Sequence, residues 1–114
     1  MRPEDFENSR CTQFLEDLSE QAVFDHHAQS LETADLIFCD APKDGKFEYK
    51  FLNYLSQYPF NERTRYLVLD DIRFLNMAPL WRQIDSPKLD LTSFGHWSGT
   101  GIVDISKGLL FKKA

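Results

Sequence analysis

The chain has 114 residues, of which 18 are acidic and 13 are basic, and its formal charge is -5. This length allows one domain with a modest core. An acidic chain without a basic stripe is poorly suited to bind nucleic acid or an anionic membrane surface. No apolar run approaches the roughly 20 residues that span a bilayer, and no signal-peptide pattern is present. The sequence therefore predicts a cytoplasmic protein that binds neither nucleic acid nor membrane.

The first third of the chain predicts one helix. Residues 1–10 are polar and show no period, so we interpret them as a disordered start or a remnant. Thr12–Leu15 is a weak strand candidate. A helix is expected from Glu20, with Asp17 or Ser19 as its cap, because one face recurs every fourth position. The residues of this face are Val23, His27 and Leu31, with Phe24 beside them.

The centre of the chain predicts a strand, a helix and a second strand. Leu36–Cys39 is continuously apolar, which suits a parallel sheet covered on both faces. A helix from about Phe47 has one apolar face, could be capped by Asp44, and should stop before Pro59. Tyr66–Leu69 is the second apolar strand, and its crossover should be right-handed. Both cysteines of the chain are expected to be reduced.

The last third predicts a short helix near Met77, where Pro79 is tolerated in the first turn. Lys88–Thr92 and Ile102–Ile105 alternate between polar and apolar residues, which favours a closing pair of antiparallel strands. The expected fold is therefore α/β, with a Rossmann-like, mostly parallel sheet, helices on its faces and a terminal antiparallel strand pair.

Carboxylates follow both apolar strands. Asp40 comes directly after the first strand, and Asp70 and Asp71 come after the second. Ligands of open α/β sheets bind at the carboxyl ends of the strands. Unit charges 4 Å apart repel by about 4 kcal/mol at an effective dielectric constant near 20, and a hard ion such as Mg²⁺ would relieve that repulsion. The equally weighted alternative is that Asp71 points away and the other two cap loops or helices.

Lys43 lies three residues after Asp40, within reach of the same pocket. A lysine there can act as a general base when desolvation or a nearby cation lowers its pKa toward roughly 7 to 8. The commoner fate of a loop lysine is to be solvated.

These residues carry a resemblance to a known family. Asp40-Ala41-Pro42-Lys43-Asp44 and Leu67-Val68-Leu69-Asp70-Asp71 resemble the catalytic half of class I S-adenosylmethionine-dependent methyltransferases, closest to the metal-dependent, catechol O-methyltransferase-like enzymes. The resemblance implies Asp40, Asp70 and Asp71 as Mg²⁺ ligands and Lys43 as the base toward the hydroxyl of a small-molecule substrate. It places Asp17 where the family often contacts the adenine of the cofactor.

The resemblance covers roughly Thr12 to Ile105. The family binds its cofactor with a glycine-rich turn after the first strand, whereas the first glycine of this chain is Gly45. Residues 1–114 therefore look like a single partial domain, the C-terminal half of such an enzyme without two central strands. Such a chain would leave a sheet edge uncovered, which invites a homo-oligomer or pairing with the missing N-terminal half. A non-catalytic remnant or assembly module is the main alternative.

A less favoured alternative comes from another class. Asp35–Asp40, followed by Pro42 and Asp44-Gly45, also resembles the phosphoacceptor strand of response-regulator receiver domains. That family needs an acidic pair some forty residues earlier and a Ser or Thr at the end of the next strand. This chain has Asp70 at the latter position.

Overall fold

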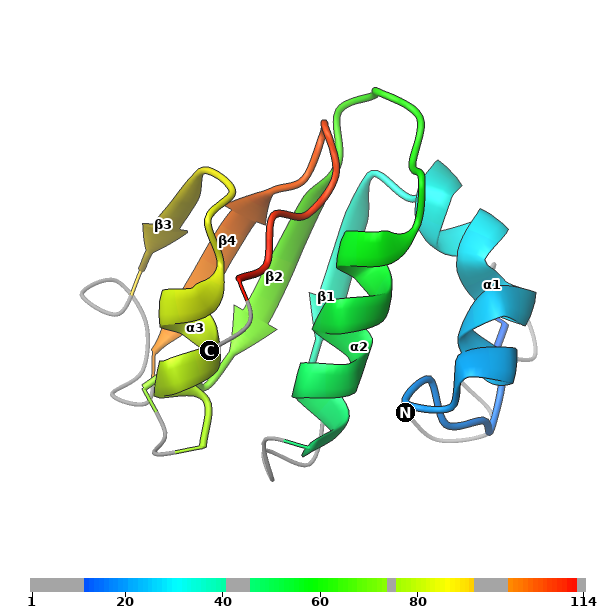
Figure 1. Ribbon diagram of the computed structural model, residues 1–114, viewed down its shortest axis with the longest axis horizontal. Helices are drawn as coiled ribbons and strands as arrows, with labels where there is room; N and C mark the ends of the chain where they lie inside the picture. The colour runs from blue at the N-terminus through cyan, green and yellow to red at the C-terminus, as the bar shows by residue number, and fades with distance from the viewer. Residues whose placement is uncertain (1–11, 41–45, 74–75, 92–98, 113–114) are drawn as a thin grey trace.

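A computed structural model describes residues 12–40, 46–73, 76–91 and 99–112 (Figure 1). The elements are α1 (Gln21–Thr33), β1 (Leu36–Cys39), α2 (Lys46–Gln57), β2 (Tyr66–Asp70), α3 (Ala78–Gln83), β3 (Lys88–Asp90) and β4 (Thr100–Asp104). No helix in the described ranges has the length and apolar character needed to cross a bilayer.

The strands form one mixed sheet in the order β1-β2-β4-β3. β1 pairs parallel to β2, whereas β4 pairs antiparallel to both β2 and β3. Three of the described strands therefore run in one direction and β4 runs in the other. The fold is α/β, and the predicted antiparallel pair at the end of the chain is confirmed.

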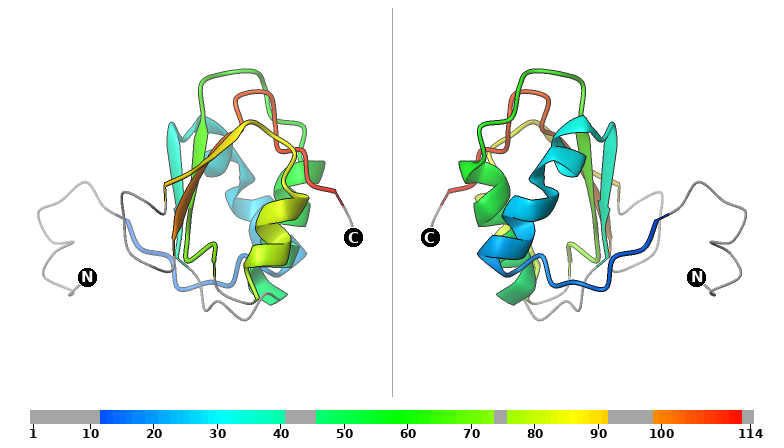
Figure 2. Two further views of the ribbon diagram at one scale, coloured as in Figure 1. Left: turned by 90° about the vertical axis from the view of Figure 1, so that its left-hand side faces the viewer. Right: turned by 90° about the vertical axis from the view of Figure 1, so that its right-hand side faces the viewer.

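The three helices of the described chain lie on one face of this sheet (Figure 2). Alternate strand residues point into the core on that face, where Ile37, Leu67 and Val103 are buried. On the opposite face, the side chains of Leu36 and Phe38 are 59% and 60% exposed. The expectation of a sheet covered on both faces is therefore wrong for the described residues. An apolar strand can be buried on both faces, but other segments must supply the second covering layer.

The amphipathic pattern of α2 determines its packing. Phe51, Leu52 and Leu55 are buried against the sheet, at the three- and four-residue spacing of one helix face. The helix ends at Gln57, two residues before Pro59, as predicted. Glu48 in its first turn is also buried, which the sequence pattern does not indicate.

The start of α1 differs from expectation. Its N-cap is Glu20 rather than Ser19 or Asp17. Asp17 instead accepts hydrogen bonds from the backbone N–H and the hydroxyl of Ser19, at 2.9 and 2.7 Å, and these form a turn before the helix. Thr12–Leu15 is not a strand. The strand prediction is wrong within this chain, because two adjacent apolar residues do not by themselves bring a segment into the sheet of their own chain.

A buried arginine joins the end of α1 to the start of β2. Arg65 is 0% exposed, and its guanidinium donates hydrogen bonds to the backbone oxygens of Glu32, Ile105 and Asn61. It also lies 4.7 Å from the centroid of the Phe60 ring. The carbonyl of Glu32, in the last turn of α1, thereby finds a donor.

The packing of α3 against β4 depends on a glycine. A Cβ atom at Gly101 of β4 would lie 2.5 Å from Cζ3 of Trp81, so only glycine lets the α3 indole pack against β4. Lys88 of β3 donates hydrogen bonds to the backbone oxygens of Trp81 and Ile84, at 2.6 and 2.7 Å. These contacts hold α3 on the sheet next to the carboxyl end of β2.

Candidate metal centre

The ends of β1 and β2 bring two aspartates to the same edge of the sheet. Asp40 follows β1 directly, and Asp70 is the last residue of β2. Because these strands are parallel and Cys39 pairs with Leu69 in the register, the residues that end them are neighbours. The alternate residues that precede these strand ends, Ile37 and Cys39 in β1 and Leu67 and Leu69 in β2, are buried and hold the strands in the core.

Asp71 adopts a backbone conformation that is unusual for a residue other than glycine. Its φ angle is 58°, in the left-handed region that Asp and Asn tolerate better than most residues. Its backbone N–H donates a hydrogen bond of 3.0 Å to Oδ1 of Asp70. This bend ends β2, and residues held in sparsely populated conformations are typical of functional sites.

The three carboxylates converge. One carboxylate oxygen from each of Asp40, Asp70 and Asp71 lies within 4.8 Å of the other two. Asp40 is exposed and the other two are half-buried, so the cluster is open to solvent on one side. The alternative in which Asp71 points away is therefore wrong. Carboxylate oxygens are the donors that hard divalent cations such as Mg²⁺ prefer, so the chemistry of this donor set suits Mg²⁺.

The other predicted site residues are less informative. Lys43 and Asp44 lie outside the described residues. Asp17 lies in the segment that leads into α1, and it is not a member of the acidic group. The hydrogen bonds that Asp17 accepts from Ser19 lower the pKa of its carboxyl group below the ordinary value. Asp17 is thus ionised and presented to solvent.

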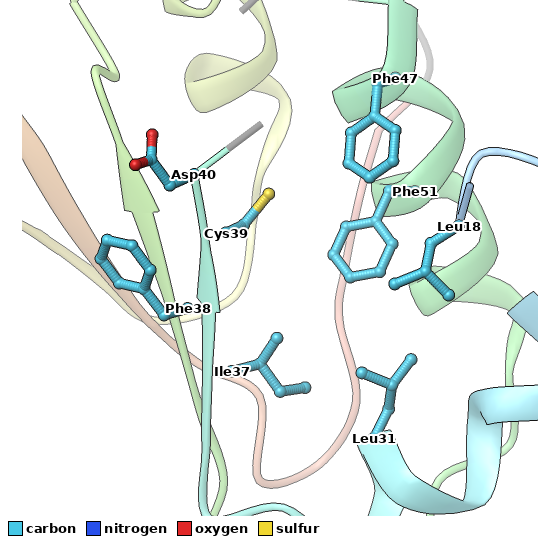
Figure 3. A pocket seen from close by; sticks show the side chains of 8 residues that line it. All are labelled: Leu18, Leu31, Ile37, Phe38, Cys39, Asp40, Phe47 and Phe51. Carbon is cyan, nitrogen blue, oxygen red and sulfur yellow. The ribbon is translucent and has the colours of Figure 1, made fainter. Parts of the chain in front are cut away.

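A cavity that the sequence does not signal lies beside β1 (Figure 3). Its volume is about 370 Å³. The lining residues are Leu18, Leu31, Ile37, Phe38, Cys39, Asp40, Phe47 and Phe51. Cys39 is buried and forms no disulfide, as predicted; Cys11 lies outside the described residues. The lining of the cavity is almost wholly apolar. Asp40 belongs to it, but its carboxylate points to the other side of β1 (Figure 3).

Fold and site together define an α/β protein with an acidic cluster where two parallel strands end. A scan against protein-family models, a search of curated proteins and a search of solved structures each found no match. The functional argument therefore depends on the geometry of the site.

Proposed function

We propose that this chain is the magnesium-binding, C-terminal part of a cytoplasmic S-adenosylmethionine-dependent O-methyltransferase that acts on a small molecule. The observation that carries the proposal is the convergence of Asp40, Asp70 and Asp71 from two parallel strands. The strand, helix, strand order and the closing antiparallel pair also agree with the family that the two motifs resemble.

Each residue of the site has a proposed role. Asp40, Asp70 and Asp71 hold Mg²⁺ through carboxylate oxygens. The bound ion supplies Lewis-acid polarisation of a substrate hydroxyl. Lys43, in its neutral form, would accept the proton of that hydroxyl. The O–CH₃ bond would form as the S–CH₃ bond of the cofactor breaks, and S-adenosylhomocysteine would leave. Asp17 contacts the adenine of the cofactor.

Cofactor binding needs more than these residues. The sequence has no glycine before Gly45, so it lacks the glycine-rich turn with which the family holds S-adenosylmethionine. In the proposal, that turn comes from a preceding segment of a longer chain or from a partner. The uncovered edge at β1 is where such a unit would join the sheet.

Calorimetric titration of the metal-free chain with MgCl₂ tests the metal site. We expect saturable binding that weakens at least about tenfold in Asp70→Asn and in Asp71→Asn, because each loses one anionic ligand. Asp25→Asn is the matched control, since Asp25 is an exposed aspartate on α1. Undetectable binding by the parent chain, or equal binding by all four proteins, would refute the proposed site.

A second experiment tests the catalytic step. In an assembly with methyltransferase activity, Lys43→Met should abolish turnover and leave cofactor binding largely intact, because only the base is removed. Unchanged turnover would contradict this role for Lys43.

The exposed strand edge favours a second candidate, a non-catalytic assembly module. Magnesium binding without methyl transfer, in a complex that contains the glycine-rich turn, would favour the module. Labelling of Asp40 by acetyl phosphate would instead favour a receiver domain.

A further inference from the structure

The cavity beside β1 exposes the main chain of the strand as well as its side chains. Ile37 and Cys39 direct their side chains into the cavity, whereas the side chains of Phe38 and Asp40 point to the other side of β1 (Figure 3). Phe38 and Asp40 nevertheless line the cavity. They therefore contribute to it through their main chain.

The direction of these peptide groups follows from the pairing with β2. The backbone N–H of Tyr66 donates to the carbonyl of Asp35, at 3.0 Å, so the Asp35 carbonyl faces β2. Peptide groups alternate sides along a strand, which turns the N–H and C=O of Leu36 and Phe38 toward the opposite edge. β1 is the outer strand on that side of the described sheet. An apolar cavity next to such an edge fits an added β-strand.

The surroundings restrict what this strand can be. The exposed side chains of Leu36 and Phe38 flank the position on one face of the sheet, and the cavity flanks it on the other, so the added strand needs apolar side chains on both faces. Leu18 and Leu31 stand across the cavity from β1 (Figure 3).

The described chain contains a segment with exposed apolar side chains. Thr12–Leu15, called the arm below, forms no helix or strand, and its Phe14 and Leu15 side chains are 60% and 88% exposed. Successive residues of an extended segment point to opposite faces, as the position beside β1 requires. Within its own chain the arm is tied to α1, because His27 contacts both Glu16, at 2.9 Å, and the Phe14 ring.

We propose that two copies of this chain exchange arms, each arm adding to β1 of the other copy as an antiparallel strand. The antiparallel direction keeps Glu16 and Asp17 away from the acidic cluster. It places Glu16 opposite Asp35, whose charge is already paired with Arg63. A parallel arm would instead bring Glu16 and Asp17 toward the acidic cluster at the carboxyl end. The exchange does not rest on the proposed methyl transfer, and the arm would occupy the same edge of β1 at which the proposed function places the glycine-rich unit.

The oligomeric state tests the exchange. Light scattering coupled to size-exclusion chromatography should show a dimer whose fraction rises with concentration, and Leu15→Lys should convert it to a monomer with an unchanged circular dichroism spectrum. Leu110→Lys is the matched control, because Leu110 is 62% exposed elsewhere in the chain. A monomer at every concentration overturns the proposal. So does a dimer that Leu15→Lys leaves intact or that Leu110→Lys dissociates.

A backbone substitution separates strand addition from simple apolar contact. Phe38→Pro removes an N–H that faces the open edge and leaves the groups that face β2. Phe38→Ala removes the same ring but keeps the N–H. We expect the dimer to be weaker in Phe38→Pro than in Phe38→Ala, and equal weakening would overturn strand addition.

Disulfide formation tests the register. When Phe14 lies opposite Ile37, Thr12 lies opposite Cys39 in a pair whose separation suits a disulfide. In a Cys11→Ser background, Thr12→Cys should give a disulfide-linked dimer on a non-reducing gel. Gln13→Cys, whose side chain would point to the opposite face, should remain largely unlinked. Linkage that is absent in both variants, or equal in both, overturns the proposed register.

Discussion

Removing one charge from the acidic cluster should stabilise the metal-free protein. One oxygen of each carboxylate lies within 4.8 Å of one oxygen of the other two. Unit charges at that limiting distance repel by about 3.5 kcal/mol at an effective dielectric constant of 20, and by about 0.9 kcal/mol in water. Asp70→Asn relieves repulsion with both Asp40 and Asp71 and keeps an oxygen that can accept the hydrogen bond from the Asp71 N–H. Because the cluster is open to solvent on one side and its members also have other interactions, we expect a gain of no more than about 1 kcal/mol in the free energy of unfolding.

Magnesium should reverse the ranking of the two proteins. An ion that binds only the folded state stabilises it by about 2.7 kcal/mol at a hundred times its Kd. We expect MgCl₂ to raise the Tm of the parent chain and to have little effect on Asp70→Asn, which has lost a ligand. Urea unfolding in EDTA and thermal unfolding with and without MgCl₂, both followed by circular dichroism, measure these effects.

The same experiments include a control and a refuting result. Asp25→Asn removes an exposed charge on α1 and should respond to magnesium as the parent chain does. If Asp70→Asn is less stable than the parent chain in EDTA and still gains stability from magnesium, the carboxylates neither repel one another appreciably nor bind the ion together.

Three further predictions concern packing and charge. Arg65→Met should lower the free energy of unfolding by about 3 kcal/mol or more in urea titrations, because buried carbonyls lose their donors. Gly101→Ala should lower it by about 1 to 3 kcal/mol, because the new methyl group collides with Trp81. Ser19→Ala should raise the depressed pKa of Asp17 toward its ordinary value in an NMR titration. The pKa of Asp17 is lower in the folded state than in the unfolded state. The ionised carboxyl therefore stabilises the fold above the unfolded-state pKa, and this stabilisation is lost as the pH falls through the folded-state pKa. In Ser19→Ala, less stability should be lost over this pH range.

Each of these predictions has a control. Arg73→Met removes an arginine that is 59% exposed and paired with Asp90, and it should lower the free energy of unfolding by less than about 1 kcal/mol. If Arg65→Met lowered it by no more than Arg73→Met does, the stabilising role of the buried Arg65 hydrogen bonds would be contradicted. Trp81→Ala should cancel much of the effect of Gly101→Ala, and strict additivity would argue against the collision. Ser30→Ala, on the exposed surface of α1, should leave the Asp17 titration unchanged.

The local sequence pattern was sufficient for most elements of the fold. The continuous apolar runs that end in Asp40 and Asp70 predicted β1 and β2, and the four-residue spacing from Phe47 predicted α2. These signals are local, since strand and helix periods follow from the backbone alone. Parallel neighbours terminate at the same edge, so the meeting of the two strand ends also followed from the sequence. The roles of Lys43 and Asp17 remain predictions.

Only the tertiary structure decided which surfaces are covered. The sequence did not show that β4 lies between β2 and β3, that Leu36 and Phe38 remain exposed, or that a cavity borders β1. It also gave no sign that Arg65 would be buried, because a charged side chain is buried only where distant carbonyls gather around it. The position of a residue within the strand or helix period determines which way its side chain points. The residues that this side chain meets come from segments far away in the chain.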